Sequence, residues 1–493
     1  MPRFLFLLIS VFCWNVKANS LKTCFNEWDS TADIILKDEP LYSELNFQDN
    51  VRKLVRPQGY IAVNSTRDVQ IALKCLQLLN LQFAIKSGGH SYEKYSRGNT
   101  DAFVIDLSRL NEIEFDRRTQ SVMVGAGVQA HAVSKRIWEM GNYGLPVGGC
   151  PTVGISGFTL GGGFGPMSRK WGLMCDNVVE MEVILADQRR VRASTRQNAD
   201  LFWSLRGGGG GNFGIVTKFY LKPFDASAQL IVSTISYEIS DFPSMFTKWL
   251  QWAATNPASS IDSIIYFKIF APDSLVLKFV ISDKDLDKSI EALNSIKRYF
   301  NEVDDPEHMK IVPFIDSLYP FYNNATKPSL VYEKHKSFFV SKWLNSTEVN
   351  SFNEKLVEHS YAQFLIQLCG GKISEKSATE TAFYHRGTFF ELDFGFTVPL
   401  RKDGDIQGTI ADGEELEPKL KQFTESISLF IKDKAAYVNV IDGDLQCPLE
   451  KYYDKNYSKL KMVKRRYDQR DVFKFPLSIP LTCVCSNESC VHG

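Results

Sequence analysis

Short apolar runs and amphipathic stretches alternate along the first half of the chain, and this pattern predicts a mixture of strands and helices. Runs of strand character occupy Phe103–Leu107, Ser121–Gly125 and Val178–Leu185. Stretches with apolar positions at helical spacing occupy Thr66–Leu79 and Val128–Met140. Because these elements are interspersed with many glycines, they indicate a domain of the α+β class.

The pattern changes past Pro223, where the glycine density falls, and this change predicts a second domain. Amphipathic helical stretches in this part are Asp285–Phe300 and Leu416–Phe430. Aromatic-rich runs of strand character are Ile261–Phe270 and Phe389–Phe396. No repeat, low-complexity tract or flexible linker separates the two parts, so we expect the domains to pack together.

The N-terminal residues combine Arg3 with an apolar run, Phe4–Trp14, and with small residues that end at Ala18. This arrangement predicts a secretory signal peptide at residues 1–18. A membrane anchor is the alternative, but a bilayer span needs about 20 apolar residues and no later segment supplies them. We therefore expect a secreted protein that is not held in a membrane.

Charge and composition narrow the possible partners. The chain has 57 Lys plus Arg and 57 Asp plus Glu, and it contains no long basic run. The balanced charge therefore gives no indication of a nucleic-acid partner. The length of 493 residues suits two or three domains, and a hydrophobic content of 44% excludes a disordered chain.

Sequons and cysteines are both abundant, as in many secreted proteins. Five Asn-x-Ser/Thr sequons begin at Asn64, Asn324, Asn345, Asn456 and Asn487. Of the 10 cysteines, Cys13 leaves with the signal, and the odd number that remains predicts one thiol with a special role. The closely spaced Cys483, Cys485 and Cys490 favour a local disulfide, because secretion favours disulfides. A zinc site is the alternative.

Three glycine clusters carry the clearest chemical signal. The first runs from Ser87 to Tyr92, the second from Gly149 to Gly165, and the third from Gly207 to Gly214. Backbone N–H groups in such clusters can approach an anion closely, so three of them imply one large, flat, phosphorylated ligand. None fits the dinucleotide fingerprint, and the chain has no P-loop, HExxH helix or GxSxG elbow.

Two of these clusters carry a family resemblance. Lys86–Tyr92 and Gly149–Gly165 resemble the flavin-attachment motifs of the berberine bridge enzyme-like group, within the vanillyl-alcohol oxidase type of FAD-linked oxidases. The resemblance continues in segments between Arg169 and Val216, and Tyr453–Pro480 is similar to the closing segment of the group. The middle of the chain matches much more weakly.

The resemblance implies a fold and a division of the chain. The fold class is α+β: a two-subdomain FAD-binding domain of the vanillyl-alcohol oxidase type, with an inserted antiparallel-sheet substrate domain and a C-terminal segment returning to the FAD domain. The expected parts are an FAD-binding domain at 50–225, a substrate-binding domain at 226–430, a berberine-bridge-like segment at 431–482 and a Cys-containing tail at 483–493. Cys24 and Cys75 resemble the N-terminal disulfide of the family.

The resemblance also implies bicovalent FAD, with His90 attached to the 8α-methyl group and Cys150 to C6 of the ring. Two bonds raise the flavin potential, which favours taking hydride from a poor donor. Cys150 then becomes the special thiol. In this family a valine at the position of Val153 generally admits oxygen to the flavin, so an oxidase is expected. The motifs further imply cofactor contacts from Ser87, Gly88, Gly89, Ser91, Val153, Gly154, Gly157, Gly161, Gly162, Gly214, Ile215, Val216 and Asn439.

Catalytic side chains are expected on strands of the inserted domain. Phe383–Arg386 resembles the family's entry to such a strand, and Glu391 and Asp393 follow on one face of it. We rank Asp393 first, Glu391 second and Tyr437 third as the base that takes the substrate's hydroxyl proton. An aromatic neighbour such as Phe394 would raise the pKa of the carboxylate by desolvation. The alternative is that the two carboxylates lie on an ordinary solvent-facing strand.

Two positions depart from the family pattern. Val440 stands where many members carry a tyrosine that helps to deprotonate the substrate, and Phe158 where a histidine often supports negative charge near the reduced ring. The leading hypothesis is a secreted FAD oxidase that acts on an alcohol or carbohydrate hydroxyl carbon and reduces O₂ to hydrogen peroxide. The alternatives are an FAD-dependent dehydrogenase with another electron acceptor and a secreted flavin-binding protein without turnover. No metal is expected.

Overall fold

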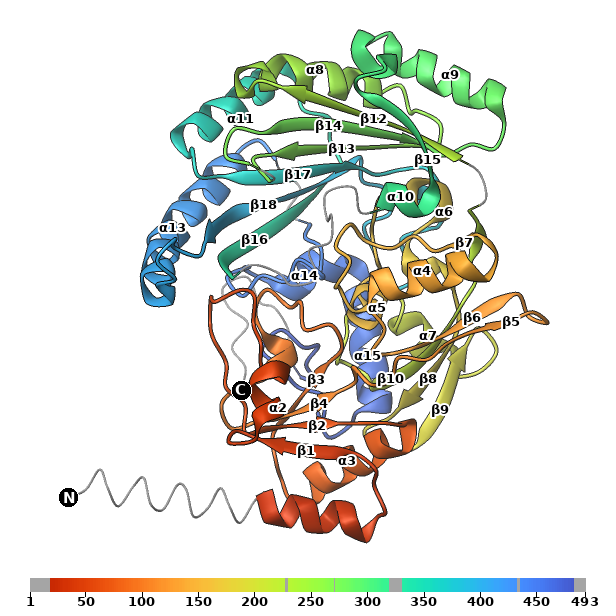
Figure 1. Ribbon diagram of the computed structural model, residues 1–493, viewed down its shortest axis with the longest axis vertical. Coiled ribbons are helices and arrows are strands. Elements are labelled where there is room, and N and C mark those ends of the chain that lie inside the picture. Colours follow the sequence, from red (N-terminus) through yellow and green to blue (C-terminus); the bar gives the residue numbers. More distant parts are fainter. Residues whose placement is uncertain (1–17, 227–228, 270, 319–329, 432–434, 483–493) are drawn as a thin grey trace.

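The computed structural model describes residues 18–226, 229–269, 271–318, 330–431 and 435–482. Two regions, each with its own hydrophobic core, are stacked along the long axis of the molecule (Figure 1). The expected signal peptide, apart from Ala18, and the expected cysteine tail lie outside the described residues. Within the described ranges, no helix has the length and apolar character that a membrane crossing requires.

The lower region in Figure 1 begins with a four-stranded sheet in the order β1-β2-β4-β3. Strands β2, β4 and β3 run parallel, and β1 is antiparallel at the edge. The elements are β1 Asp33–Leu36, α2 Pro40–Leu45, β2 Gly59–Ala62, α3 Thr66–Leu78, β3 Phe83–Lys86 and β4 Phe103–Asp106. Helix α3 begins where the Ser65 side chain accepts the Asp68 N–H, an N-cap that satisfies an otherwise unpaired donor. Because β3 ends at Lys86, the first glycine cluster leaves the carboxyl end of a parallel strand.

A five-stranded antiparallel sheet in the order β5-β6-β10-β8-β9 completes this region. Its strands are β5 Ile113–Asp116, β6 Ser121–Gly125, β8 Val178–Ile184, β9 Arg190–Ser194 and β10 Ile215–Leu221. The helices nearby in sequence are α4 Ala130–Gly141, α5 Ile155–Leu160, α6 Ser168–Trp171 and α7 Ala199–Ser204. The pair β7 Tyr143–Gly144 and β11 Phe224–Asp225 is separate. Ile61 of β2 and Val124 of β6 belong to one core, so both sheets share it.

The upper region is built on a seven-stranded antiparallel sheet in the order β15-β12-β14-β13-β17-β18-β16. Its strands are β12 Gln229–Tyr237, β13 Ile261–Phe267, β14 Leu275–Ile281, β15 Met309–Pro313, β16 Val331–Val340, β17 Gln363–Leu368 and β18 Phe390–Pro399. The long helices α8 Phe242–Ala253, α9 Leu286–Lys297, α11 Ser346–Glu358 and α13 Ile406–Ile427 cover one face (Figure 1). Two short helices are α10 Phe314–Leu318 and α12 Lys372–Glu375.

The two faces of this sheet differ in chemistry. Along β17 and β18, Phe364, Leu392 and Phe394 point into the aromatic core beneath the helices. Side chains alternate along a strand, so Glu391 and Asp393 point to the opposite face. That opposite face looks toward the lower region (Figure 1).

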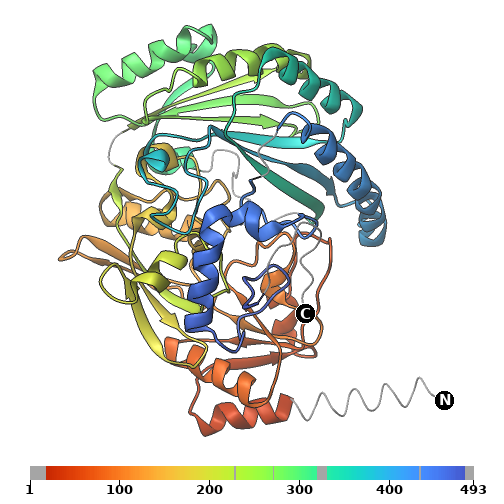
Figure 2. The ribbon, with the colours of Figure 1, turned by 180° about the vertical axis from the view of Figure 1, so that it is seen from behind.

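The chain ends its described course in the lower region. Helices α14 (Pro448–Tyr453) and α15 (Tyr457–Tyr467) lie there, blue beside the yellow and orange elements in Figures 1 and 2. Leu460 and Val463 of α15 join its core. The buried ammonium of Lys464 contacts four oxygen acceptors: the carbonyls of Asn212 (3.0 Å) and Phe473 (2.6 Å) and the carboxylates of Asp468 (2.7 Å) and Asp471 (3.1 Å). The C-terminal helix is therefore part of this region's core.

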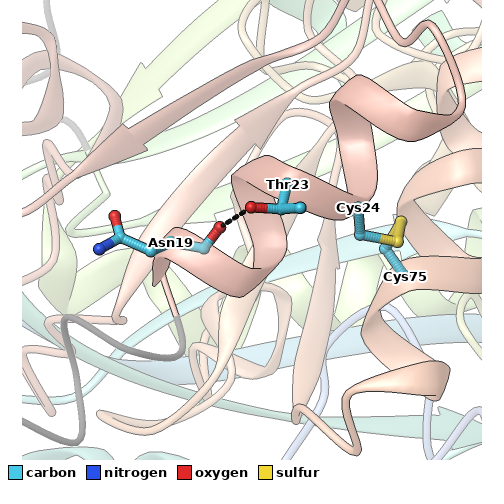
Figure 3. Close-up of a disulfide and its surroundings, with 4 residues drawn as sticks. All are labelled: Asn19, Thr23, Cys24 and Cys75. Carbon is cyan, nitrogen blue, oxygen red and sulfur yellow. Dashed lines mark hydrogen bonds between the residues drawn. A yellow bond between two sulfur atoms is a disulfide. The ribbon is translucent and has the colours of Figure 1, made fainter.

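Four of the described cysteines are either paired with each other or deeply buried. Cys24 and Cys75 form a disulfide, so the expected pairing is confirmed (Figure 3). Cys175 and Cys369, whose pairing the sequence does not indicate, are buried free thiols. Both lie in an apolar cluster that contains Phe164. They pack there as small hydrophobic side chains.

Candidate active site

The two predicted attachment residues lie close together. Thr152 links them: its Oγ1 is 3.0 Å from Nε2 of His90 and 3.7 Å from Sγ of Cys150. Both side chains remain partly exposed, and Cys150 is a free thiol. Burial lowers the pKa of His90, which keeps its imidazole neutral at neutral pH.

The glycines around this pair form a tight backbone junction next to open space. A Cβ placed on Gly88 would lie 2.2 Å from the amide nitrogen of Gly154, so only glycine permits this approach of the two loops. Gly149 and Gly157, by contrast, have nothing within 4 Å of an added Cβ. Space therefore lies beside Cys150. This junction and the open space fit a planar flavin ring.

Ala126 connects the two loops to the sheet behind them. Its carbonyl accepts the hydroxyls of Ser87 (2.7 Å) and Ser156 (2.6 Å), and its N–H donates to the carbonyl of Thr217 in β10 (3.0 Å). Ser91 closes a turn in the first loop, where its carbonyl accepts the N–H of Lys94. The loops are thus held by bonds within the lower region.

The structure places other predicted cofactor residues in supporting positions. Gly89 has a positive φ of 79°, and the carbonyl of Val153 accepts the N–H of Ala130 (2.9 Å). Ile215 and Val216 are buried in β10, where they pair with β8. Gly214 precedes them and packs against β8. The segment Gly214–Val216 therefore supports the loops from its position in the sheet behind them.

Tyr437 and Asn439 brace the segment after the cysteine loop. Asn439 donates its amide to the carbonyl of Phe158 (3.0 Å) and to the Tyr437 hydroxyl (2.9 Å), and its side chain packs on Gly161. The Tyr437 oxygen also accepts two backbone N–H groups, one of them from Phe164 (2.9 Å). Burial raises the pKa of Tyr437. Because the hydroxyl therefore stays protonated, Tyr437 is a poor proton acceptor.

The remaining residues of this segment complete one wall. Gly162 has a positive φ of 116° and packs on the ring of Phe383. Val440 is buried in the same apolar cluster as Tyr437, so it offers packing where many family members have a tyrosine. The ring of Phe158 packs close to Gly148. These contacts are apolar, in keeping with the two departures noted in the sequence.

Asp393 has a partner that the sequence did not reveal. Its Oδ1 is 2.8 Å from Nδ1 of His335 on the neighbouring strand β16. The expectation that Phe394 desolvates Asp393 is wrong, because Phe394 points into the core on the other face of β18. His335 lies on the same face as Asp393, and its ring stacks on Tyr92 with 4.9 Å between centroids.

Glu391 lies deeper on the same face. It is buried, and its Oε1 has no hydrogen-bond partner among the described residues. Burial, and then the charge of Asp393, raise the pKa of Glu391 well above its ordinary value. A carboxyl group held neutral in this way cannot accept a proton. Glu391 is therefore suited to hydrogen bonding.

Sequence reasoning missed His335, Thr152 and the stacking role of Tyr92. Thr152 and Tyr92 lie inside the matched motifs, so the sequence did indicate a cofactor site close to them. His335 lies in the weakly matched middle of the chain. The local sequence around it is a run of five polar residues, Glu333 to Ser337, which shows no alternation and so does not indicate which face of the strand His335 lies on.

An ion network ties the first loop to the upper region. Glu93, three residues after His90, contacts Arg52 (3.1 Å), Lys53 (2.6 Å) and Lys334 of β16 (2.8 Å). Its side chain has 0% exposure. Lys334 also contacts Asp442, near the C-terminal helices, at 2.9 Å. A single buried carboxylate thus joins three segments that are distant in sequence.

Comparison with known proteins agrees with this arrangement. Residues 57–194 match the "FAD binding domain" family and residues 436–480 the "Berberine and berberine like" family. An uncharacterised FAD-linked oxidoreductase of Bacillus subtilis (strain 168) is 29% identical over 460 residues, covering 91% of this chain and 97% of its own. Berberine bridge enzyme-like 2 of Arabidopsis thaliana is 28% identical, covering 88% of this chain and 86% of its own.

Solved structures show the same fold. BBE-like 1 of Physcomitrella patens has a TM-score of 0.82 at 26% identity and covers 94% of this chain and 100% of its own. A chitooligosaccharide oxidase has a TM-score of 0.81 at 22% identity, with the same coverage, and supports the fold alone. With its two flavin loops facing an inserted antiparallel sheet, the chain is an FAD-linked oxidoreductase of the vanillyl-alcohol oxidase fold. Within that class it is similar to the berberine bridge enzyme-like proteins.

Proposed function

We propose that the chain is a secreted oxidase with bicovalently attached FAD, which oxidises a hydroxyl-bearing carbon of an alcohol or carbohydrate and reduces O₂ to hydrogen peroxide. The observation that carries the proposal is the meeting of His90 and Cys150 at the Thr152 hydroxyl, beside Gly149 and Gly157, where space is open. His90 would hold the 8α-methyl group of the ring and Cys150 its C6 position. When bound, FAD supplies a two-electron acceptor for hydride, and two covalent bonds raise its potential.

The states of the two residues suit bond formation. Neutral His90 keeps a ring lone pair, which a bond from nitrogen to carbon requires. Cys150 is unpaired and partly exposed, so a ligand can reach its sulfur. The walls formed by Asn439 and Phe383 would fix the ring's position and exclude water from one side.

The polar face of the seven-stranded sheet supports a hydroxyl-bearing substrate. His335, Gln367, Glu391 and Asp393 offer donors and acceptors there, while Phe339 supplies an apolar surface. Such a mixture suits a sugar, whose hydroxyls need hydrogen bonds and whose ring faces are apolar. Chitooligosaccharide oxidase and the glucooligosaccharide oxidase of Acremonium strictum share the fold. The Cys24–Cys75 disulfide supports an oxidising compartment.

Two measurements test the proposal on the purified full-length protein. Flavin should remain with the protein after acid precipitation, and His90→Ala and Cys150→Ala should each keep one of the two bonds. A panel of sugars, sugar oligomers and aromatic alcohols should then be screened for peroxide formation in air. Release of all flavin from the wild type would refute bicovalent attachment. Flavin reduction without peroxide would indicate a dehydrogenase. If no compound reduces the flavin, the result would indicate a flavin-binding protein without turnover.

A further inference from the structure

The contact between His335 and Asp393 assigns different roles to the two ring nitrogens of the histidine. Nδ1 faces Oδ1 of Asp393 at 2.8 Å. Since a carboxylate accepts hydrogen bonds, it selects the tautomer that carries a proton on Nδ1. Nε2 is then the acceptor. Within the described residues it has no hydrogen-bond partner, and it is not sealed from solvent, since 11% of the side chain remains exposed.

The ring of His335 is held on two further sides. Tyr92 stacks on it at an interplanar angle of 20°, and Tyr92 belongs to the loop that carries His90. Neighbouring strands β16 and β18 hold His335 and Asp393 through a continuous ladder. The imidazole therefore sits between the flavin-attachment loop and the polar face of the sheet, where its orientation cannot change freely.

We propose that His335 is the catalytic residue that takes the substrate's hydroxyl proton, on Nε2, and that Asp393 is its positioning residue. This inference rests on the proposed function above. The substrate O–H bond breaks, its proton goes to Nε2, and its electron pair forms the new C=O bond. The C–H hydrogen leaves as hydride to the flavin acceptor of this enzyme class. Asp393 holds Nδ1–H and stabilises the imidazolium that results.

The charged groups around His335 determine the pH at which it can act. Asp393 on β18 and Glu333 on β16 face it, and Lys94 and Asp49 of the lower region lie near Glu333. Burial alone would lower the pKa of His335, but Asp393 and Glu333 outweigh burial and raise it above 6.5. A base works only when unprotonated, so substrate oxidation should rise as the pH passes this raised pKa.

The test measures the rate of anaerobic flavin reduction by the best substrate of the panel. Stopped-flow absorbance monitors this reduction at pH values between 5 and 9. His335→Gln should slow reduction by at least about 10²-fold and abolish the rise with pH. Asp393→Asn removes a negative charge, so it should move the rise to lower pH. His359→Gln is the matched control, because His359 packs against Phe423 on the helix-covered side of the sheet.

A folding defect is separated from a chemical one by two readouts. The flavin content of each variant reports an intact cofactor site, and added imidazole should restore reduction at least tenfold in His335→Ala but not in wild type. Reduction of His335→Gln at the wild-type rate, with the rise unchanged, overturns the inference and leaves the proposed function standing. A wild type that no substrate reduces overturns both.

Discussion

Replacing Glu93 by Gln should destabilise the protein strongly, because the carboxylate is fully buried among cations. Removing one partner of a buried ion pair typically costs about 3–5 kcal/mol. Lys334 retains Asp442 at 2.9 Å and Arg52 retains Glu417 at 2.6 Å, so neither cation loses its only partner. We therefore expect the lower end of this range, about 3 kcal/mol or roughly 10²-fold in the folding equilibrium.

The same substitution should change how stability depends on pH. Burial alone would raise the pKa of Glu93, but Lys334, Lys53 and Arg52 outweigh burial and lower it. A carboxylate whose folded pKa is depressed stabilises the fold above its unfolded pKa of about 4.3, and that contribution fades as the pH falls below this value. The difference between wild type and Glu93→Gln should thus be complete at pH 7 and smaller at pH 3.5.

Urea unfolding followed by tryptophan fluorescence at the two pH values measures both effects. Glu354→Gln on α11 is the matched control, since Glu354 is exposed, and it should shift the midpoint little at either pH. A loss below about 1 kcal/mol for Glu93→Gln would contradict the reasoning, because exposed ion pairs already reach that value. An equal difference at both pH values would contradict the role assigned to its charge.

Three further results are expected. Lys464→Met should cost about 3–5 kcal/mol in unfolding free energy by leaving the Asp468 carboxylate buried without its cation, and Asp468→Leu added to it should recover part of that loss. Mass spectrometry of glycopeptides should find no glycan on Asn456, which is 3% exposed and donates its amide to three backbone carbonyls, whereas Asn345 is exposed. Val153→Ile should slow the reoxidation of reduced flavin by air, measured by stopped flow, with substrate reduction unchanged.

The local pattern was sufficient for many elements of the fold. Ser121–Gly125 is a strand with the predicted bounds, because its side chains are buried on both faces and read as a continuous apolar run. Helix α13 begins at Ile406, ten residues before the predicted start at Leu416. The first part of that helix contains Gly408 and Gly413 and many acidic residues, so it lacks the apolar spacing that reveals a helix. The α+β fold class with an inserted antiparallel sheet is confirmed.

The site was predictable where its residues are consecutive, and not where it depends on pairing across strands. His90 and Cys150 lie in glycine-rich loops that can be read directly from the sequence. His335 and Asp393 are 58 residues apart, and they meet only because β16 pairs with β18 in one particular register. The role expected of Phe394 failed for a simpler reason. Adjacent residues in a strand point to opposite faces, so Phe394 could not desolvate Asp393.

The place of α15 in the lower core has a consequence for synthesis. Strand β10 ends at Leu221, and the helix that closes its core begins only at Tyr457. At about 5–20 residues per second, the intervening chain of roughly 240 residues takes about 10–50 s to emerge from the ribosome. During that time the apolar surfaces that later pack against Leu460 and Val463 are exposed and can bind other molecules. Nascent chains that stop before Tyr457 should therefore bind chaperones, and those that extend past Pro480 should release them.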